Sequence, residues 1–169
     1  MTVTIFEYTK IINRENIEFG NKVLIDDFVL IYAKHKMKIG SYTHIGSFSS
    51  IVASDYVEMD DFSVLSHGCR IFSASDDFIT GGFGSPLVNI KYRNITKAPV
   101  ILKKFAIIGA NSVILPGVTI GEGASVGANS VITKNLEPWG VYINNKKVKD
   151  RDQKGVLRNY EKFCLENNI

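Results

Sequence analysis

The side chains of this 169-residue chain that are best suited to chemistry are three histidines and one pair of adjacent aspartates. The histidines are His35, His44 and His67, and the aspartates are Asp76 and Asp77. A neutral imidazole, with an ordinary pKa of about 6.5, can accept a proton at neutral pH. A carboxylate can orient that imidazole, accept a proton itself or attract a cationic amine. These residue types indicate proton transfer, provided that the fold brings them together.

The elements that must position these side chains are defined by a repeat of six residues. In the second half of the chain, large aliphatic residues recur at this spacing from Leu102 to Ile132. The residue two places before each of them is small or β-branched. This pattern is neither the period of a helix nor the simple alternation of an ordinary strand. The aliphatic positions are Leu102, Ile108, Ile114, Ile120, Val126 and Ile132.

The same repeat governs the first half of the chain. Three triplets begin 20 residues apart, which leaves two extra residues at one corner of each turn. The phase is then lost for 31 residues, between Ile71 and Leu102. The repeat therefore predicts five coils of three short strands. The three early triplets are Phe19, Ile25 and Ile31; Ile39, Ile45 and Ile51; and Met59, Leu65 and Ile71.

A unit of six residues is too short to bury its own apolar face. Stacking one coil on the next buries a continuous aliphatic core and pairs the backbone between coils. The sequence thus predicts an all-β solenoid, a parallel β-helix of about five coils, over residues 1–151. The alternative is a sandwich of amphipathic strands, and the constant spacing of six argues against it.

Two segments do not follow the repeat. Residues 72–99 are predicted to form a long inserted loop with three glycines and an aromatic residue, Tyr92, beside Arg93. A loop of this length is either a binding loop or a variable surface insertion. Residues 152–169 place apolar side chains at helical spacing, which predicts a short amphipathic C-terminal helix. We expect this helix to cap the open end of the solenoid, where strand edges are unpaired.

Composition narrows the classes of protein. The chain is 45% hydrophobic and 22% charged, so wholesale disorder is excluded, and a net charge of +3 is too mild to indicate nucleic-acid binding. The two cysteines, Cys69 and Cys164, are too few for a disulfide framework or a zinc cluster, and both are predicted to be core residues. No apolar run is long enough to span a membrane, and no secretory signal is recognisable. We expect a cytoplasmic protein without a metal.

The stretch APVILKKFAIIGANSVILPGVTIGEGASVGANSVITKNLEPWGVY resembles the hexapeptide-repeat acyltransferases. Among these it is most similar to the sugar acetyltransferases of galactoside, maltose and surface-polysaccharide type, and the likeness extends from residue 17 to about residue 151. The resemblance implies a left-handed parallel β-helix, acetyl-CoA as co-substrate, and a homotrimer with its sites between subunits. It does not specify the acceptor. For CoA it implies a groove of small residues with nearby cations: Gly109, Ala110, Gly127, Ala128, Lys134, Lys146 and Lys147.

The catalytic residues differ from the pattern of the resembling family. In the galactoside-type enzymes the resemblance implies a histidine in the long loop, and this chain has Asp76 at that position. Polysaccharide-type relatives commonly carry a second histidine where this chain has Phe105. Because both are absent, His67 is the predicted catalytic base, in one column with Ala110 and Ala128, and Asp76 is predicted to assist it. The alternative for His67 is a turn histidine exposed to solvent.

The acceptor is predicted to be a sugar, acetylated on oxygen or nitrogen in cell-surface polysaccharide or nucleotide-sugar synthesis. A nucleotide-linked amino sugar suits the site, because a neutral amine needs little activation and paired carboxylates attract its cationic form. Predicted substrate contacts are His44, Asp77, Tyr92 and Arg93, whereas His35 is predicted to be solvated surface. The alternatives are a non-catalytic trimeric scaffold and a metal enzyme of γ-carbonic-anhydrase type. The spacing of the three histidines does not fit the metal enzyme.

Overall fold

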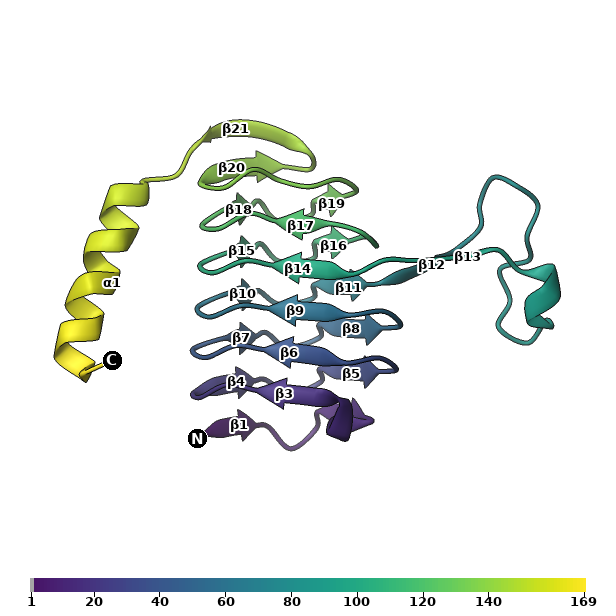
Figure 1. Cartoon of the computed structure of the whole chain (residues 1–169), viewed down its shortest axis with the longest axis horizontal. Helices are drawn as coiled ribbons and strands as arrows, with labels where there is room; N and C mark the ends of the chain where they lie inside the picture. Colours follow the sequence, from purple (N-terminus) through teal and green to yellow (C-terminus); the bar gives the residue numbers. More distant parts are fainter. Residues whose placement is uncertain (1) are drawn as a thin grey trace.

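The computed structural model describes residues 2–169, which form a parallel β-helix with one projecting arm and one helix beside it (Figure 1). Three sheets wrap around the core, and each coil contributes one short strand to each sheet. The first sheet has eight strands, the second six and the third five. Neighbouring strands are parallel, except that β21 runs antiparallel to β20 at the C-terminal edge of the first sheet.

The strands are two to five residues long. In stacking order, the first sheet contains β1 (Val3–Ile5), β4 (Val23–Ile25), β7 (His44–Ile45), β10 (Val64–Leu65), β15 (Ile107–Ile108), β18 (Ser125–Val126), β20 (Gly140–Ile143) and β21 (Lys146–Asp150). The second contains β2 (Lys10–Ile12), β5 (Leu30–Ala33), β8 (Ser50–Ala53), β11 (Arg70–Phe72), β16 (Val113–Ile114) and β19 (Val131–Ile132). The third contains β3 (Ile17–Phe19), β6 (Met37–Ile39), β9 (Val57–Met59), β14 (Val100–Leu102) and β17 (Thr119–Ile120).

The aliphatic residues of the repeat form three buried columns, one beneath each sheet. In the second sheet, Ile31 pairs in register with Ile51, which pairs with Ile71, and the column continues through Ile114 to Ile132. All five of these side chains are fully buried. The predicted solenoid is therefore confirmed, and it is the left-handed β-helix that the resemblance implied. Strands β1 and β2 extend the stack beyond the predicted coils, because they pair with β4 and β5.

Three corners join the sheets in each coil. Corner I connects the first sheet to the second and includes Phe28, Phe48, Gly68, Asn111 and Asn129. These five residues share a left-handed backbone conformation, with φ between 57° and 71°. Asparagine and glycine adopt this conformation more readily than other residues, so phenylalanine is unusual there.

Corner II connects the second sheet to the third, and the arm leaves from it. The arm contains β12 (Ala74–Asp76), the short 3₁₀ helix η2 (Ile90–Tyr92) and β13 (Ile95–Lys97), with β12 and β13 antiparallel. It extends well away from the coils (Figure 1). A second 3₁₀ turn, η1 (Arg14–Asn16), occupies the corresponding corner near the N-terminus.

Corner III connects the third sheet to the first and includes Tyr42, Phe62 and Phe105, again in the left-handed conformation. The rings of Tyr42 and Phe62 are stacked, with centroids 4.8 Å apart. Helix α1 (Gln153–Asn167) places Phe163 edge-on against both of these rings, at 5.1 and 5.5 Å. Its Tyr160 contacts Phe62 and Phe105 in the same manner.

The helix therefore lies along the side of the stack, at corner III, and does not cover the open end (Figure 1). The predicted cap is wrong in this respect, because Tyr160 and Phe163 pack against the aromatic rings of corner III along the side of the stack. Arg151 fixes the approach to the helix, since its Nη1 donates to the carbonyls of Phe105 and Gly123 at 2.8 and 2.9 Å. Burial lowers the pKa of this guanidinium.

Replacing Phe163 with alanine should reduce the free energy of unfolding by about 1–3 kcal/mol, because two edge-to-face ring contacts are lost, each contributing about 0.5–1.5 kcal/mol. Urea denaturation at constant protein concentration measures this change. Leu165→Ala is the matched control, since Leu165 lies on the same helix and is 80% exposed. Equal effects of the two substitutions would show that the helix is not held by its aromatic face.

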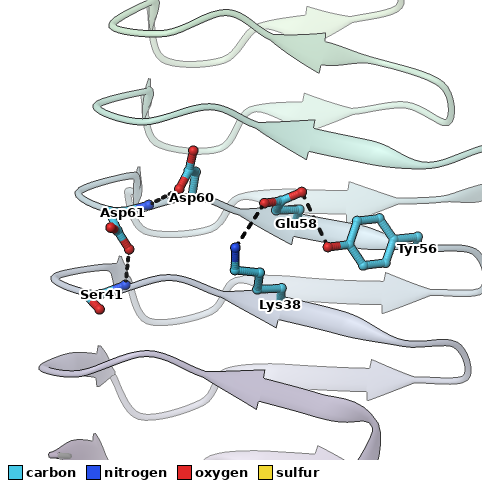
Figure 2. Close-up of polar contacts among 6 residues, drawn as sticks. All are labelled: Lys38, Ser41, Tyr56, Glu58, Asp60 and Asp61. Carbon is cyan, nitrogen blue, oxygen red and sulfur yellow. Dashed lines mark hydrogen bonds and ion pairs between the residues drawn. The ribbon is translucent and has the colours of Figure 1, made fainter.

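Polar residues on the outer face of the third sheet support the stack from outside (Figure 2). Lys38 Nζ lies 3.4 Å from Glu58 Oε1, and Tyr56 donates to the other carboxylate oxygen at 3.3 Å. The Glu58 carboxylate raises the pKa of Lys38, and burial raises the pKa of Tyr56. Nearby, the N–H of Ser41 donates to Asp61 Oδ1 at 2.6 Å, which links two coils. The charged side chains of Lys38, Glu58 and Asp61 therefore link neighbouring coils on this face.

Within residues 2–169, the one α-helix, α1, is too short and too polar to cross a lipid bilayer.

Candidate functional site

The predicted base, His67, lies at corner I between β10 and β11, with its side chain exposed. The N–H of Asn111 donates to the carbonyl of His67 at 2.9 Å, and the N–H of Asn129 donates to the carbonyl of Ala110 at 2.8 Å. These bonds place His67, Ala110 and Ala128 in three consecutive coils, one above the other. The structure thus forms the column that the repeat predicts, and the chemical role of His67 stays a prediction.

Above His67, corner I presents small residues. A Cβ atom at Gly109 would lie 2.6 Å from the backbone N of Ala128 and 2.6 Å from the carbonyl O of Val126. Only glycine therefore permits the two coils to approach this closely. Gly127, Ala110 and Ala128 add little side-chain bulk beside Gly109, so a narrow, flexible ligand chain can lie along this edge.

The three predicted phosphate-binding lysines differ in their surroundings. Lys147 on β21 forms an ion pair with Asp150, and this hydrogen bond raises the pKa of the lysine. Within residues 2–169, neither Lys134 nor Lys146 has an ion-pair partner. Both are exposed, so their charges are available to an anion.

The arm brings two of the predicted site residues into direct contact. Nη2 and Nε of Arg93 donate to Oδ1 of Asp76, at 2.6 and 3.2 Å. Arg93 is largely buried and Asp76 keeps part of its surface exposed, with side-chain exposures of 12% and 31%. A substrate amine that approaches Asp76 would therefore meet a carboxylate whose charge is already balanced by Arg93. The second carboxylate oxygen of Asp76, Oδ2, makes no hydrogen bond within residues 2–169.

The side chain of Asp77 stabilises a turn within the arm. Its carboxylate accepts hydrogen bonds from the backbone N–H groups of Ile79, Thr80 and Gly82, each at 2.8 Å, and from the Thr80 hydroxyl. These donors hold the pKa of Asp77 well below its ordinary value. The oxygens are thus already used in a turn, and the substrate contact predicted for Asp77 stays a prediction.

Asp77→Asn should loosen the arm without changing the stability of the β-helix. Since folding lowers the pKa of Asp77, its stabilising contribution is present above the unfolded pKa of about 3.9 and is lost as the pH falls through the lower folded value. Protease cleavage within residues 72–99 should therefore be faster in the variant at pH 7. In the wild type it should not accelerate between pH 7 and pH 5. Identical cleavage rates for the two proteins would contradict this role.

The remaining arm residues extend away from the coils. Tyr92 lies in η2, where the ammonium group of Lys91 sits 4.8 Å from its ring centroid. Phe78, Ile79 and Leu87 are at least 90% exposed. No part of the described chain covers these three apolar side chains.

A cavity of about 480 Å³ lies at the base of the arm. The residues that line it include Asp76 and Arg93 of the arm, together with Lys34, His35 and Lys97. His35, which is predicted to be solvated surface, is exposed and also lines the cavity that holds Asp76. The sequence feature that indicates this location is the position of His35 at corner II, where each early coil has two extra residues and where the arm begins.

His44 faces outward from the first sheet, and its predicted contact with the substrate stays a prediction. Its Nε2 lies 3.0 Å from Asp26 Oδ2, so the imidazole is oriented by a carboxylate from the preceding coil. Phe105 is 7% exposed and packs beneath Tyr160 of α1. The position of the second family histidine is thus part of the helix-packing corner in this chain. Within residues 2–169, no three His, Cys, Asp or Glu side chains are grouped to hold a metal ion.

A left-handed β-helix built on a six-residue repeat, with a long arm at one corner, is the architecture of the hexapeptide-repeat class of transferases. Residues 99–134 match the family described as "Bacterial transferase hexapeptide (six repeats)". The dTDP-4-amino-4,6-dideoxy-D-glucose acyltransferase of Escherichia coli is 34% identical over 143 residues, covering 83% of this chain and 74% of that protein. The putative lipopolysaccharide biosynthesis O-acetyl transferase WbbJ of E. coli K12 is 28% identical over 125 residues, which cover 72% of this chain and 61% of WbbJ.

Solved structures agree with this assignment. AntD, an N-acyltransferase from Bacillus cereus in complex with dTDP and 3-hydroxybutyryl-CoA, matches with a TM-score of 0.90 and 37% identity. The match covers 96% of this chain and 87% of AntD. A hexapeptide-repeat acetyltransferase from Vibrio cholerae shares the fold at 20% identity and a TM-score of 0.69. The chain therefore belongs to the hexapeptide-repeat acyltransferases, and it is an enzyme of this family, as the sequence predicted.

Proposed function

We propose that the protein transfers an acyl group, acetyl in the first instance, from acyl-CoA to the amine of a nucleotide-linked amino sugar for cell-surface polysaccharide synthesis. The observation that carries this proposal is the 36–37% identity to AntD over almost the whole chain. One AntD structure holds both dTDP-4-amino-4,6-dideoxyglucose and CoA. The relative WbbJ is an O-acetyl transferase by name, so transfer to a hydroxyl is the alternative that the experiment must separate.

In this proposal CoA lies along the upper part of corner I. Its pantetheine arm follows the exposed backbone of Gly109, Ala110, Gly127 and Ala128, and its thioester points toward His67. Lys134 and Lys146 bind the phosphates of CoA. Lys147 also contacts the phosphates while it keeps its ion pair with Asp150. The supporting observations are the small side chains and, within residues 2–169, the N–H groups of Ala110 and Ala128, which donate no hydrogen bond.

The chemical step requires only a neutral amine and a base. The amine nitrogen attacks the thioester carbonyl carbon, the C–S bond breaks, and the amine proton passes to the base while CoA leaves as its thiolate. A backbone N–H at the corner stabilises the oxyanion. We assign the base to His67 and the orientation of the amine to Asp76. Arg93 holds Asp76, and His44, Asp77 and Tyr92 remain the proposed contacts to the rest of the acceptor.

We further propose that the active enzyme is a homotrimer with its sites between subunits, working in the cytoplasm. Phe78, Ile79 and Leu87 support the trimer, because exposed apolar side chains at the end of an arm are stable when a neighbouring subunit covers them. In such an assembly the arm of one subunit brings its Asp76 to a site formed with the next. Sedimentation equilibrium tests the trimer directly.

Calorimetric titration with CoA, followed by dTDP-linked amino sugars and matched hydroxyl sugars, tests the proposal. Binding of CoA together with one amino-sugar nucleotide, and release of free thiol only when that sugar is present, would support N-acylation. Turnover with the hydroxyl sugar alone would replace it with O-acylation. Absence of CoA binding would refute the acyltransferase assignment for the site at corner I.

A further inference from the structure

The lower half of corner I carries an exposed stack of aromatic rings that the proposed mechanism does not use. Tyr8 and Phe28 are parallel with centroids 5.6 Å apart, and Phe28 and Phe48 are parallel with centroids 5.2 Å apart. We call these three residues the aromatic ladder. Their exposures are 62%, 54% and 62%, although aromatic side chains of this size are usually mostly buried.

The ladder stops at the coil of His67. The next positions of the same corner are Gly68, Asn111 and Asn129, which are small or polar. Corner I therefore has two halves that meet at His67: an upper half of small residues, and a lower half of flat apolar rings. Phenylalanine at a left-handed position is disfavoured, so Phe28 and Phe48 are not explained by the local backbone.

A positive charge lies where the two halves meet. Nη1 of Arg70 donates to the carbonyl oxygens of Phe48 and Gly68, at 2.7 and 2.6 Å. Within residues 2–169, Arg70 has no carboxylate partner, and its Nε and Nη2 groups make no hydrogen bond. A half-buried guanidinium with free donors is suited to bind a phosphate with two parallel hydrogen bonds.

The two acidic residues that precede Phe28 are already engaged in hydrogen bonds. Asp27 accepts a hydrogen bond from the N–H of Tyr8 at 2.9 Å, and Asp26 is paired with His44. Arg70 is the cation at the junction of the two halves, whereas Glu7 and Lys10 lie at the far end of the ladder, beside Tyr8. The ladder and Arg70 together combine an apolar, flat surface with one cation.

The spacing fits an elongated ligand. Neighbouring coils are about 4.8 Å apart, so the ring of Phe28 lies about 10 Å below the level of His67. Arg70 belongs to the coil of His67, and its Nη1 reaches down to the carbonyl of Phe48 in the next coil. A nucleoside diphosphate sugar has its flat base, its diphosphate and its sugar in this same order. With the sugar at His67, its diphosphate would reach Arg70 and its base would reach Phe28 and Phe48.

We propose that the lower half of corner I is the acceptor subsite, in which the aromatic ladder holds the pyrimidine base and Arg70 binds the diphosphate of the nucleotide. This inference rests on the proposed function and specifies its acceptor site. Donor and acceptor then lie end to end on one corner, with CoA above His67 and the nucleotide below it. The base packs edge-to-face against the exposed rings, an arrangement that aromatic pairs favour.

The test is calorimetric binding of dTDP to the full-length protein, with CoA as an internal control. In the variant Phe28→Asn/Phe48→Asn, the lower coils receive the residue that Asn111 and Asn129 already provide in the upper coils, so the backbone conformation is preserved. The dissociation constant for dTDP should rise about tenfold, because the edge-to-face contacts between the base and the two rings are lost together with their buried apolar area. The constant for CoA should stay within about twofold.

Arg70→Gln provides an independent test that does not depend on the aromatic variant being folded. It should weaken dTDP binding about tenfold and leave binding of thymidine, which has no phosphate, unchanged. Lys10→Gln is the matched control, because Lys10 occupies the same outward column of the second sheet three strands away and should not affect dTDP. Phe48→Tyr, which keeps the ring, should retain wild-type affinity.

Sedimentation of each variant separates the outcomes. Unchanged dTDP affinity in both the aromatic and the Arg70 variants, with wild-type binding intact, would overturn the subsite while leaving the proposed function in place. Dissociation of the oligomer by the aromatic variant, with unchanged dTDP affinity, would show that a second copy of the chain covers the ladder and would also overturn it. Failure of the wild-type protein to bind either dTDP or CoA would refute the proposed function itself.

Discussion

Replacing His67 with asparagine should lower kcat by about 100-fold or more with the correct amino-sugar acceptor. Asparagine keeps the size and polarity of the side chain but cannot accept the proton that the amine loses, and general base catalysis typically contributes a factor of about 10²–10⁴. Because His67 is exposed at corner I, the substitution should not affect folding. Steady-state kinetics that follow release of the CoA thiol measure the effect.

The binding of CoA is the control for this variant. Its dissociation constant should stay close to that of the wild type, since the proposed CoA contacts lie in the coils above. Asp76→Asn separates the two candidate bases, because loss of turnover in this variant with full activity in His67→Asn would transfer the role of base from the imidazole to the carboxylate. Such a result would leave the acyltransferase family intact and correct only the assignment of the base.

Replacing Ile71 with alanine should reduce the free energy of unfolding by about 3–4 kcal/mol. Ile71 is fully buried between Ile51 and Ile114, and its loss leaves a cavity that the stacked coils above and below cannot fill. Substitutions of this kind cost about 2–5 kcal/mol in well-packed cores. Urea denaturation of the wild type and the variant, at equal protein concentration, measures the difference.

Val131→Ala is the matched control for Ile71→Ala. Val131 belongs to the same sheet but faces outward and is 45% exposed, so its truncation should change the free energy of unfolding by no more than about 0.5 kcal/mol. A loss below about 1 kcal/mol for Ile71→Ala would mean that neighbouring coils close the cavity. The aliphatic column would then not be the main source of stability.

The columns of the β-helix were predictable because a period of six links sequence directly to three-dimensional position. Every large aliphatic residue of the repeat falls beneath one of three sheets, so the core could be assigned without knowledge of any side-chain contact. The same reasoning placed His67 in a column with Ala110 and Ala128, which the coil-to-coil hydrogen bonds reproduce.

The position of the C-terminal helix could not be predicted in this way. Helical spacing of Tyr160 and Phe163 shows that the helix has an apolar face, but it does not show which surface the face meets. That surface is formed by Tyr42, Phe62 and Phe105, at corner positions where small residues are usually expected. An aromatic residue at the same place in successive coils was the signal that would have identified it.

The contacts of the arm were the least predictable part of the candidate site. The pair His44 and Asp26 joins neighbouring coils, so the register of the repeat could have indicated it. The pair Asp76 and Arg93 depends on the antiparallel register of β12 and β13, and the arm has no repeat to specify that register. The same loss of period conceals the cavity that His35 shares with Asp76.

The arm is closed at its base. The N–H of Ala98 donates to the carbonyl of Ser73 at 3.1 Å, so the two ends of the excursion meet within one hydrogen bond. The hydroxyl of Ser73 in turn accepts from the N–H of Asp55 in the coil below, at 2.8 Å. The arm is thus an exchangeable module: it can be shortened, lengthened or grafted from a relative without disturbing the stack that carries it. If the arm contacts the sugar, as proposed for Asp76, Asp77 and Tyr92, exchange of this module would alter those contacts while the stack, with its aromatic ladder and CoA edge, remains constant.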